Sequence, residues 1–264
     1  MPRANRHYIP GCIWHITHRC HNKKFLLKYS PDRIAWLSWL LESKKRYGLC
    51  VLNYMVTCNH IHLLALDKGA RNTIPDSIKL TDGRTAQGYT TRKQLKGSFW
   101  DDRYHATAVE SGTHLARCMT YIDLNMVRAG AVGDPYEWKH CGYYEIQSRC
   151  RGYQAVDTDE LLKVLDIADV NQLRLARKNA VKEAMAKGDL SRFPAWTESV
   201  AIGSGDFVGK VKDALGTRAR SRDVLAYNEN ENLYVLQEPR AEYGGEFSEK
   251  STCLSGKNLY PWNA

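Results

Sequence analysis

Two histidines separated by one residue are the sharpest chemical feature of the sequence. They lie in the segment NHIHLL at residues 59–64. On a β-strand, residues two apart project to one face, so the imidazoles of His60 and His62 can converge on one ion. Ile61 and Leu63 then face the core. Because neutral imidazole is a common ligand for divalent metals, the spacing predicts a metal site. The alternative interpretation is the polar face of a half-buried sheet.

A tyrosine and an asparagine four residues apart are the second feature. Tyr121 and Asn125 stack on one side of a helix that Thr113 is expected to cap. A phenol is a candidate nucleophile, but its pKa of about 10 means that it needs a metal-polarised phosphate as its target. Asn125 offers a carbonyl oxygen as a third metal ligand. The alternative interpretation is a tyrosine at the rim of the core beside a solvated asparagine.

A second dense group of potential ligands suggests a zinc site instead. Its members are His15, His18, Cys20 and His21. On a strand, His15 points to the face opposite from His18 and Cys20, so these side chains do not converge. We therefore favour the pair formed by His60 and His62.

Tyr104, beside Arg103, is the rival nucleophile. It falls in an expected strand and has no Asn or Gln one helical turn away, so we favour Tyr121. Arg103 is a candidate phosphate contact, and an ion pair with Asp101, Asp102 or another acid is the alternative interpretation.

Periodicity and turn residues predict the elements that must carry these groups. The expected order up to residue 130 is strand, helix, strand, strand, one helix within a long loop, strand and helix. The corresponding ranges are 11–17, 30–48, 50–56, 60–65, 88–96, 104–109 and 113–130. The short connection between the second and third strands favours an antiparallel sheet. Residues 145–156 resemble a linker into a region with helices over 158–166 and 171–187 and another after 203–206.

The charge distribution points to a polyanionic partner. The 264 residues contain 38 Lys and Arg against 29 Asp and Glu, a net charge of +9. Basic stretches cover the first thirty residues, 68–96 and 174–192, whereas 229–249 is acidic. Any one such run is usually a solvated face, but together they make nucleic acid the leading partner class. No apolar run is long enough to span a membrane, and the eight cysteines contain no Cys-x-x-Cys pair.

In combination these motifs resemble the single-tyrosine HUH transposases and, more narrowly, the REP-associated tyrosine transposases. The resemblance covers about residues 7–145. It rests on residues 60–64, the segment FWDDRY at 99–104, the segment YIDLNMVRAG at 121–130, and the opening from Tyr8 to Asn22. Two departures are visible: Thr57-Cys58 replaces the usual Met-Pro before the histidine motif, and Met126 replaces the usual proline after the helix asparagine.

The resemblance implies an α+β fold, with an antiparallel sheet flanked by helices in a ferredoxin-like, RRM-like core. This core domain would occupy residues 1–148, and residues 149–264 would form a mostly helical extension with an acidic tail. Tyr121 would attack a phosphate of single-stranded DNA bound to Mg²⁺ or Mn²⁺ held by His60, His62 and Asn125. The products would be a 5′-phosphotyrosine and a free 3′-hydroxyl, which can rejoin by the reverse attack.

The implied partner is a REP-type DNA hairpin with an adjacent tetranucleotide, bound by a monomer or homodimer. We expect a cytoplasmic, nucleoid-associated protein with no membrane role. The candidate DNA contacts are Arg3, Arg6, Arg19, Lys23, Lys24, Arg92, Lys93, Lys96 and Arg103. Trp14, Tyr89 and Trp100 are candidates for stacking on unpaired bases, but a place in the core is the favoured interpretation for each. Two other functions stay open: a nuclease that activates water with Tyr121 as bystander, and a hairpin-binding protein without catalysis.

Overall fold

A four-stranded antiparallel sheet with two helices on one face forms the N-terminal core. The computed structural model describes residues 9–70, 72–148, 154–188, 190–228 and 232–237. The core elements are β1 (Ile13–Arg19), η1 (His21–Lys23), α1 (Ser30–Tyr47), β2 (Cys50–Val56), β3 (His60–Leu66), α2 (Thr73–Lys93) and β4 (His105–Val109). Their order in the sheet is β2-β3-β1-β4, with every neighbouring pair antiparallel. This βαββαβ arrangement confirms the expected α+β, ferredoxin-like core.

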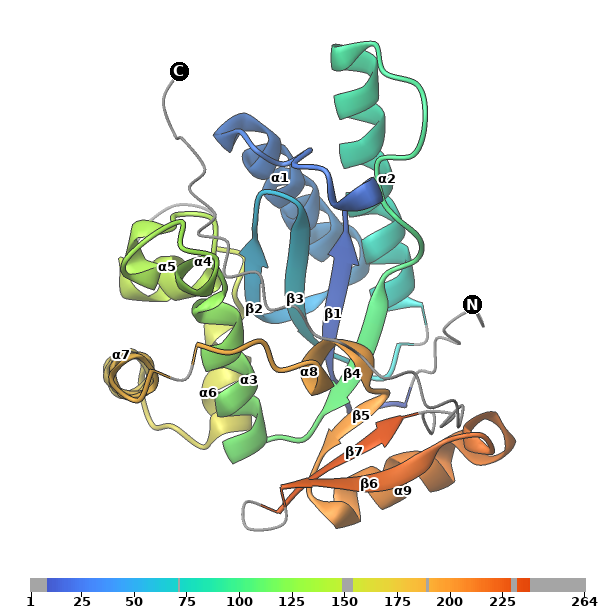
Figure 1. Ribbon diagram of the computed structural model, residues 1–264, viewed down its shortest axis with the longest axis vertical. Helices are drawn as coiled ribbons and strands as arrows, with labels where there is room; N and C mark the ends of the chain where they lie inside the picture. The colour runs from blue at the N-terminus through green and yellow to red at the C-terminus, as the bar shows by residue number, and fades with distance from the viewer. Residues whose placement is uncertain (1–8, 71, 149–153, 189, 229–231, 238–264) are drawn as a thin grey trace, which may run out of the picture.

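The register of β1 against β3 assigns the residues of the histidine motif to opposite faces of the sheet. Ile61 lies opposite His18, and His62 lies opposite Thr17. Because directly paired residues share a face, Ile61 faces α1 and α2, where His18 meets Asp82 of α2. Ile61 is fully buried, as predicted, and the histidine pair projects from the other face. Figure 1 shows α1 behind the strands β1, β2 and β3, with α2 on the side of β1 and β4.

The helix α2 differs from the sequence-based expectation. We expected a helix around 88–96, but α2 begins at Thr73 and runs through both Gly83 and Gly88. Each glycine costs about 1 kcal/mol in a helix. Packing against α1 outweighs that cost, because Ile74 and Ile78 are buried and Trp36 of α1 donates a 2.9 Å hydrogen bond to Asp82.

The predicted helix over 113–130 is broken in the middle. It consists of α3 (Thr113–Asp123) and α4 (Asn125–Arg128), which meet at Leu124 with φ −82° and ψ 3°. The apolar stripe of α3 is buried, as expected. The N-cap residue is Gly112, however, and not Thr113 as the sequence predicted. Gly130, with φ +68°, ends the segment in the left-handed conformation that glycine adopts without strain.

The C-terminal extension is largely helical, but it also enlarges the sheet. Two short elements precede the extension, η2 (Pro135–Glu137) and α5 (Gly142–Gln147). The extension itself contains α6 (Thr158–Leu165), α7 (Val170–Ala186), α8 (Ala195–Glu198), β5 (Ala201–Gly203), α9 (Gly205–Leu215), η3 (Gly216–Ala219), β6 (Asp223–Asn228) and β7 (Leu233–Gln237). β5 pairs in parallel with β4, so the complete order is β2-β3-β1-β4-β5-β7-β6. Figure 1 shows these added strands at the end of the sheet that carries β4.

The added strands escaped the sequence analysis because their patterns are weak. β5 has only three residues, and β6 shows no alternation between buried and exposed positions. The acidic tail beyond residue 237 lies outside the described residues. Within the described ranges, no helix has both the length and the apolar character needed to cross a bilayer.

Candidate metal and tyrosine site

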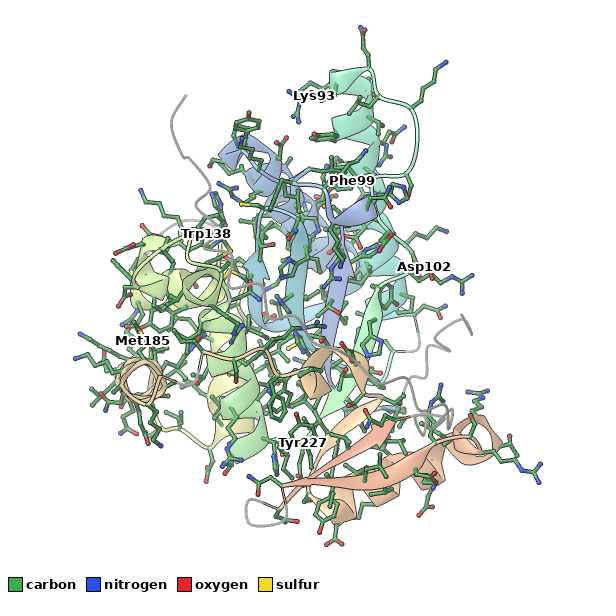
Figure 2. The ribbon with its side chains drawn as sticks, viewed as in Figure 1. Lys93, Phe99, Asp102, Trp138, Met185 and Tyr227 are labelled. Atoms are coloured by element: carbon green, nitrogen blue, oxygen red, sulfur yellow. The ribbon has the colours of Figure 1, made fainter. Side chains whose placement is uncertain are left out.

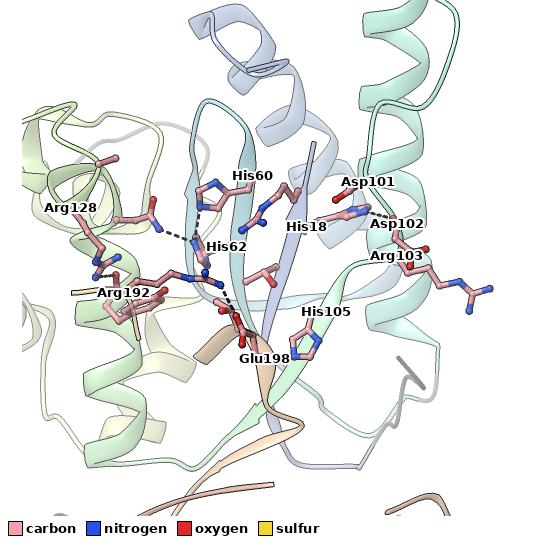
Figure 3. A pocket seen from close by; sticks show the side chains of 16 residues that line it. His18, His60, His62, Asp101, Asp102, Arg103, His105, Arg128, Arg192 and Glu198 are labelled. Carbon is pink, nitrogen blue, oxygen red and sulfur yellow. Dashed lines mark hydrogen bonds and ion pairs between the residues drawn. The ribbon is translucent and has the colours of Figure 1, made fainter. Parts of the chain in front are cut away.

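One cleft brings together the two motifs that the sequence analysis singled out. It has a volume of about 450 Å³ and its lining includes His60, His62, Tyr121 and Asn125. The histidines come from β3 (Figure 3). The tyrosine comes from α3 and the asparagine from α4. Residues some sixty positions apart in the chain therefore share one pocket, on the sheet face opposite α1 and α2.

The two imidazoles of the motif face each other through the same ring atom. The Nε2 atoms of His60 and His62 lie 3.1 Å apart. The Nδ1–H of His60 donates to the side-chain oxygen of Asn59 at 2.7 Å, and the amide of Asn125 approaches Nε2 of His62 at 3.0 Å. Because an amide oxygen only accepts, His60 carries its proton on Nδ1, and its Nε2 presents a lone pair.

His15 determines which ring nitrogen of His62 carries the proton. The sequence analysis had considered His15 only as a member of the rival zinc group. The Nδ1–H of His15 donates to the backbone carbonyl of Trp196 at 2.8 Å, and its Nε2 lies 2.9 Å from Nδ1 of His62. Burial lowers the pKa of His15 to about 3, so the ring is neutral and its Nε2 accepts. His62 therefore carries its proton on Nδ1, and its Nε2 is also unprotonated.

Two lone pairs thus face each other, an arrangement that a cation between them relieves. Burial lowers the pKa of His60 to about 4 and that of His62 well below its ordinary value, so no proton bridges them near neutral pH. Metal–nitrogen bonds of about 2.1 Å meeting at a right angle separate two nitrogens by about 3 Å, close to the spacing found here. A turn of the Asn125 amide would present its oxygen as the third ligand.

The zinc alternative finds no support in the described ranges. They contain no cluster of three or more His, Cys, Asp or Glu side chains arranged to hold a metal. His18 instead bonds Asp82 at 2.6 Å and the carbonyl of Asp102 at 2.8 Å, and it stacks on Trp100. These contacts use both ring nitrogens of His18.

Tyr121 lies between His62 and an arginine. Its ring stands perpendicular to that of His62, with 6.2 Å between centroids, and the guanidinium of Arg128 lies 4.3 Å from its centroid. Burial raises the pKa of the Tyr121 phenol, and the positive charges of Arg128 and Arg192 oppose that rise. The rival Tyr104 is buried, with 3% of its surface exposed, so it is not accessible to a substrate.

The extension contributes residues that the sequence analysis missed. Arg192, Thr197 and Glu198 line the same cleft, and Arg192 pairs with Glu198 at 2.7 Å. Arg192 carried only the signal of a basic run, and nothing in the sequence assigned it to this cleft. His15 could have been recognised only from the pairing of β1 with β3, because that register puts it on the face of His62.

A buried ion pair joins the extension to the helix of Tyr121. Arg177 of α7 donates to both carboxylate oxygens of Asp123, at 2.7 and 2.5 Å, and Asn53 donates to the same carboxylate at 3.0 Å. Burial raises the pKa of Asp123, and the charge of Arg177 opposes that rise. Asp123 lies two residues after Tyr121, so this pair anchors the end of α3.

The expected DNA contacts have different environments. Arg19 and Arg103 are exposed and line the cleft, whereas Lys23, Lys24, Lys93 and Lys96 are exposed outside its lining. Arg92 forms an ion pair with the buried carboxylate of Asp32. Arg3 and Arg6 lie outside the described residues.

The three stacking candidates are poorly placed for that role. Trp14 and Trp100 are buried, with 2% and 8% of their surfaces exposed, so they belong to the core and do not stack on bases. The ring of Tyr89 packs against Phe99, with 5.0 Å between centroids. Aromatic residues in such contacts complete the core and present little face to a ligand.

The comparison with known protein families agrees with the motif-based resemblance. Residues 8–125 match the family described as "Transposase IS200 like". A REP-associated tyrosine transposase solved in complex with a REP hairpin is 17% identical over 59% of this chain and 90% of that chain, with a TM-score of 0.49. A putative transposase from Deinococcus radiodurans R1 is 19% identical over 45% of this chain and 94% of that chain, with a TM-score of 0.31. No curated protein sequence matches the chain significantly.

Proposed function

Starting from the match of residues 8–125 to the IS200-like transposase family, we propose that this transposase-type protein cleaves and rejoins single-stranded DNA through Tyr121. The observation that carries the proposal is the meeting of Tyr121 with two unprotonated imidazole nitrogens in one cleft. A phenol alone is a weak nucleophile at neutral pH, and a cation site beside it supplies what the reaction needs.

In the proposed reaction, the phenolic oxygen of Tyr121 attacks the phosphorus of a phosphodiester. Its proton passes to solvent as the new O–P bond forms, the bond from phosphorus to the 3′ oxygen breaks, and the 3′ oxygen takes up a proton from solvent. The products are a 5′-phosphotyrosine and a free 3′-hydroxyl. Attack by a 3′-hydroxyl on the phosphotyrosine restores both the phosphodiester and the phenol, so no nucleotide cofactor is required.

We propose Mg²⁺ or Mn²⁺ as the cofactor, held by His60, His62 and Asn125. When bound, such an ion makes the phosphorus more electrophilic and neutralises the charge that develops on the phosphate. Asn59 and His15 keep the two imidazoles in the tautomer that exposes Nε2. Arg128, whose guanidinium lies over the ring of Tyr121, favours the phenolate by its charge.

The proposed substrate is a REP-type DNA hairpin with an adjacent tetranucleotide, as the sequence resemblance implies. Arg19 and Arg103 at the cleft are suited to bind phosphates of the reacting strand. The exposed lysines at positions 23, 24, 93 and 96 are suited to bind more distant phosphates.

The direct test is covalent capture of DNA. Labelled single-stranded hairpin DNA is incubated with the protein and Mn²⁺, and the products are separated on a denaturing gel. We expect label on the protein, lost in Tyr121→Phe and kept in Tyr47→Phe, which alters an exposed tyrosine that does not line the cleft. Cleavage that persists in Tyr121→Phe would favour the water-activating nuclease, and metal-independent binding without cleavage would favour a recognition protein.

A further inference from the structure

Two exposed aromatic side chains lie on the short segment between η1 and α1. Phe25 is 65% exposed and Tyr29 is 58% exposed, more than any other aromatic side chain among the described residues. Exposed aromatic rings of this kind are typical of binding surfaces. Neither residue was singled out by the sequence analysis, which named aromatics that are now found packed in the core.

Backbone and side-chain hydrogen bonds hold this segment in one conformation. The amide of Leu27 donates to the carbonyl of Cys58 at 2.9 Å, and Leu27 itself is fully buried. The guanidinium of Arg33 donates to the carbonyls of Leu27 and Lys28, at 2.8 and 2.6 Å. Because these hydrogen bonds already order the loop, a ligand that stacks on its rings binds without the entropy cost of ordering it.

The surroundings of the two rings are basic. Residues 20–31 contain three lysines and no acid, and residues 83–100 contain Arg84, Arg92, Lys93 and Lys96 and no acid. The ion pair between Arg92 and the buried carboxylate of Asp32 holds the end of α2 against the start of α1. Lys93 projects from the same end of the molecule as these elements (Figure 2). Aromatic rings among positive charges form the usual surface for single-stranded nucleic acid.

One side chain links this surface to the metal and tyrosine site. Asn59, in the turn between β2 and β3, donates from its amide nitrogen to the carbonyl of Lys23 at 3.2 Å. Its amide oxygen accepts the 2.7 Å hydrogen bond from His60. A DNA strand with a phosphate at His60 can therefore continue over this turn onto the segment that carries Phe25.

We propose that Phe25 and Tyr29 form a stacking platform for unpaired nucleotides of the DNA strand beside the reacting phosphate. The basic side chains around it bind the phosphates of those nucleotides; they are Lys23, Lys24, Lys28, Arg92, Lys93 and Lys96. The placement of the strand rests on the proposed function, whereas stacking itself requires no chemistry at Tyr121. Because every base has an aromatic face, the platform accepts many sequences but requires bases that are not paired.

The test compares two DNA hairpins with the full chain, one with a single-stranded flank and one with blunt ends. Binding is measured by fluorescence anisotropy for the wild type and for Phe25→Ala, Phe25→Leu and Phe25→Trp. We expect Phe25→Ala to weaken binding of the flanked hairpin about 5- to 150-fold, the range for one lost base stack. Phe25→Leu keeps an apolar side chain but should lose most of this affinity, and Phe25→Trp should keep it. Binding of the blunt hairpin should not change.

Tyr47→Ala is the matched control, because it removes an exposed aromatic from the opposite end of α1. Equal affinity of the wild type and Phe25→Ala for the flanked hairpin would overturn the proposal. An equal loss on the blunt hairpin would also overturn it, because the surface would then bind duplex. The covalent-capture assay on the same proteins tests the proposed reaction separately from the stacking platform. Capture without dependence of binding on Phe25 refutes only the platform, and Phe25-dependent binding without capture refutes only the proposed reaction.

Discussion

The core and the extension contribute different kinds of groups to the cleft. The core supplies the tyrosine, both imidazoles and the amide, all within residues 60–125. Besides the lining residues named above, the extension supplies hydrogen bonds to residues that themselves contact His62 or Tyr121. The carbonyl of Trp196 accepts from His15, and the carbonyl of Leu190 accepts from Arg128 at 3.0 Å. Reactive groups can therefore be encoded in short motifs while their alignment depends on a distant part of the chain.

The family match covers part of the core and none of the extension. It ends at Asn125, the last of these four residues, and includes neither Arg128 nor any residue of the extension. The contacts from the extension are thus additions around a motif-defined centre. We therefore expect variants that lose an extension contact to have a lower free energy of unfolding or a lower metal affinity, although Tyr121, His60, His62 and Asn125 are unchanged.

The largest effect is expected from breaking the buried pair of Arg177 and Asp123. Arg177→Met leaves the Asp123 carboxylate buried without its partner, at a cost of about 3–5 kcal/mol in the free energy of unfolding. Urea denaturation measures this cost. Lys187→Ala is the control, because its ion pair with Glu183 is exposed, and it should leave the urea midpoint unchanged. Similar midpoints for the two variants would mean that the extension does not anchor α3.

Acid pH should destabilise the core through its buried histidines. The pKa values of His15 and His60 fall from 6.5 to about 3 and about 4 on folding, so the unfolded chain binds more protons in this range. Stability is therefore full above about pH 6.5 and declines as the pH falls, by about 1 kcal/mol per histidine between pH 7 and pH 5.5. Urea denaturation across this range measures the slope. A slope that is the same in His15→Gln would show that His15 does not contribute.

His15 should set metal affinity without touching the metal. His15→Leu removes the acceptor for the proton on His62, and loss of such a supporting contact typically weakens metal binding about 10- to 100-fold. Titration with Mn²⁺ followed by electron paramagnetic resonance measures this, independently of DNA cleavage. His15→Gln keeps an acceptor and should restore much of the affinity.

Thr107→Val is the matched control for His15. Thr107 lies opposite His15 in the sheet and donates to the carbonyl of Ser199 at 2.7 Å, but it does not line the cleft. This variant removes a contact between core and extension without affecting His62. If it weakened Mn²⁺ binding as much as His15→Leu does, the effect would be general loosening and not the tautomer of His62.

The smallest effect is expected at the exposed pair of Arg192 and Glu198. Glu198→Gln releases Arg192 within the cleft, and exposed pairs are worth about 0.2–1 kcal/mol. DNA affinity should therefore rise by no more than about fivefold, with the largest gain at low salt. Anisotropy titrations at two salt concentrations measure the change. Weaker binding in this variant would show that Glu198 itself contributes to DNA binding.

Local patterns predicted the core well and the extension less completely. The bounds of β2 were predicted without error, and β3 ended one residue later than expected, because turn residues and β-branched or aromatic side chains define this hairpin. The helix α7 began one residue before its expected start, capped by Asp169, which accepts from the amides of Asn171 and Gln172. By contrast, α2 contains two glycines, and its packing against α1 could not be read from its own residues.

The sequence alone determined which side chains share a face, because the spacing of His60 and His62 and of Tyr121 and Asn125 assigns each pair to one side of a strand or helix. Both pairs lie within residues 8–125, the part of the chain that matches a transposase family. Only the tertiary structure decided what holds the groups in place. The register of β1 against β3 puts His15 behind His62, and the path of the extension brings Trp196 against His15 and Arg177 against Asp123. These contacts join residues 47 to 181 positions apart, a separation at which no periodic pattern carries information.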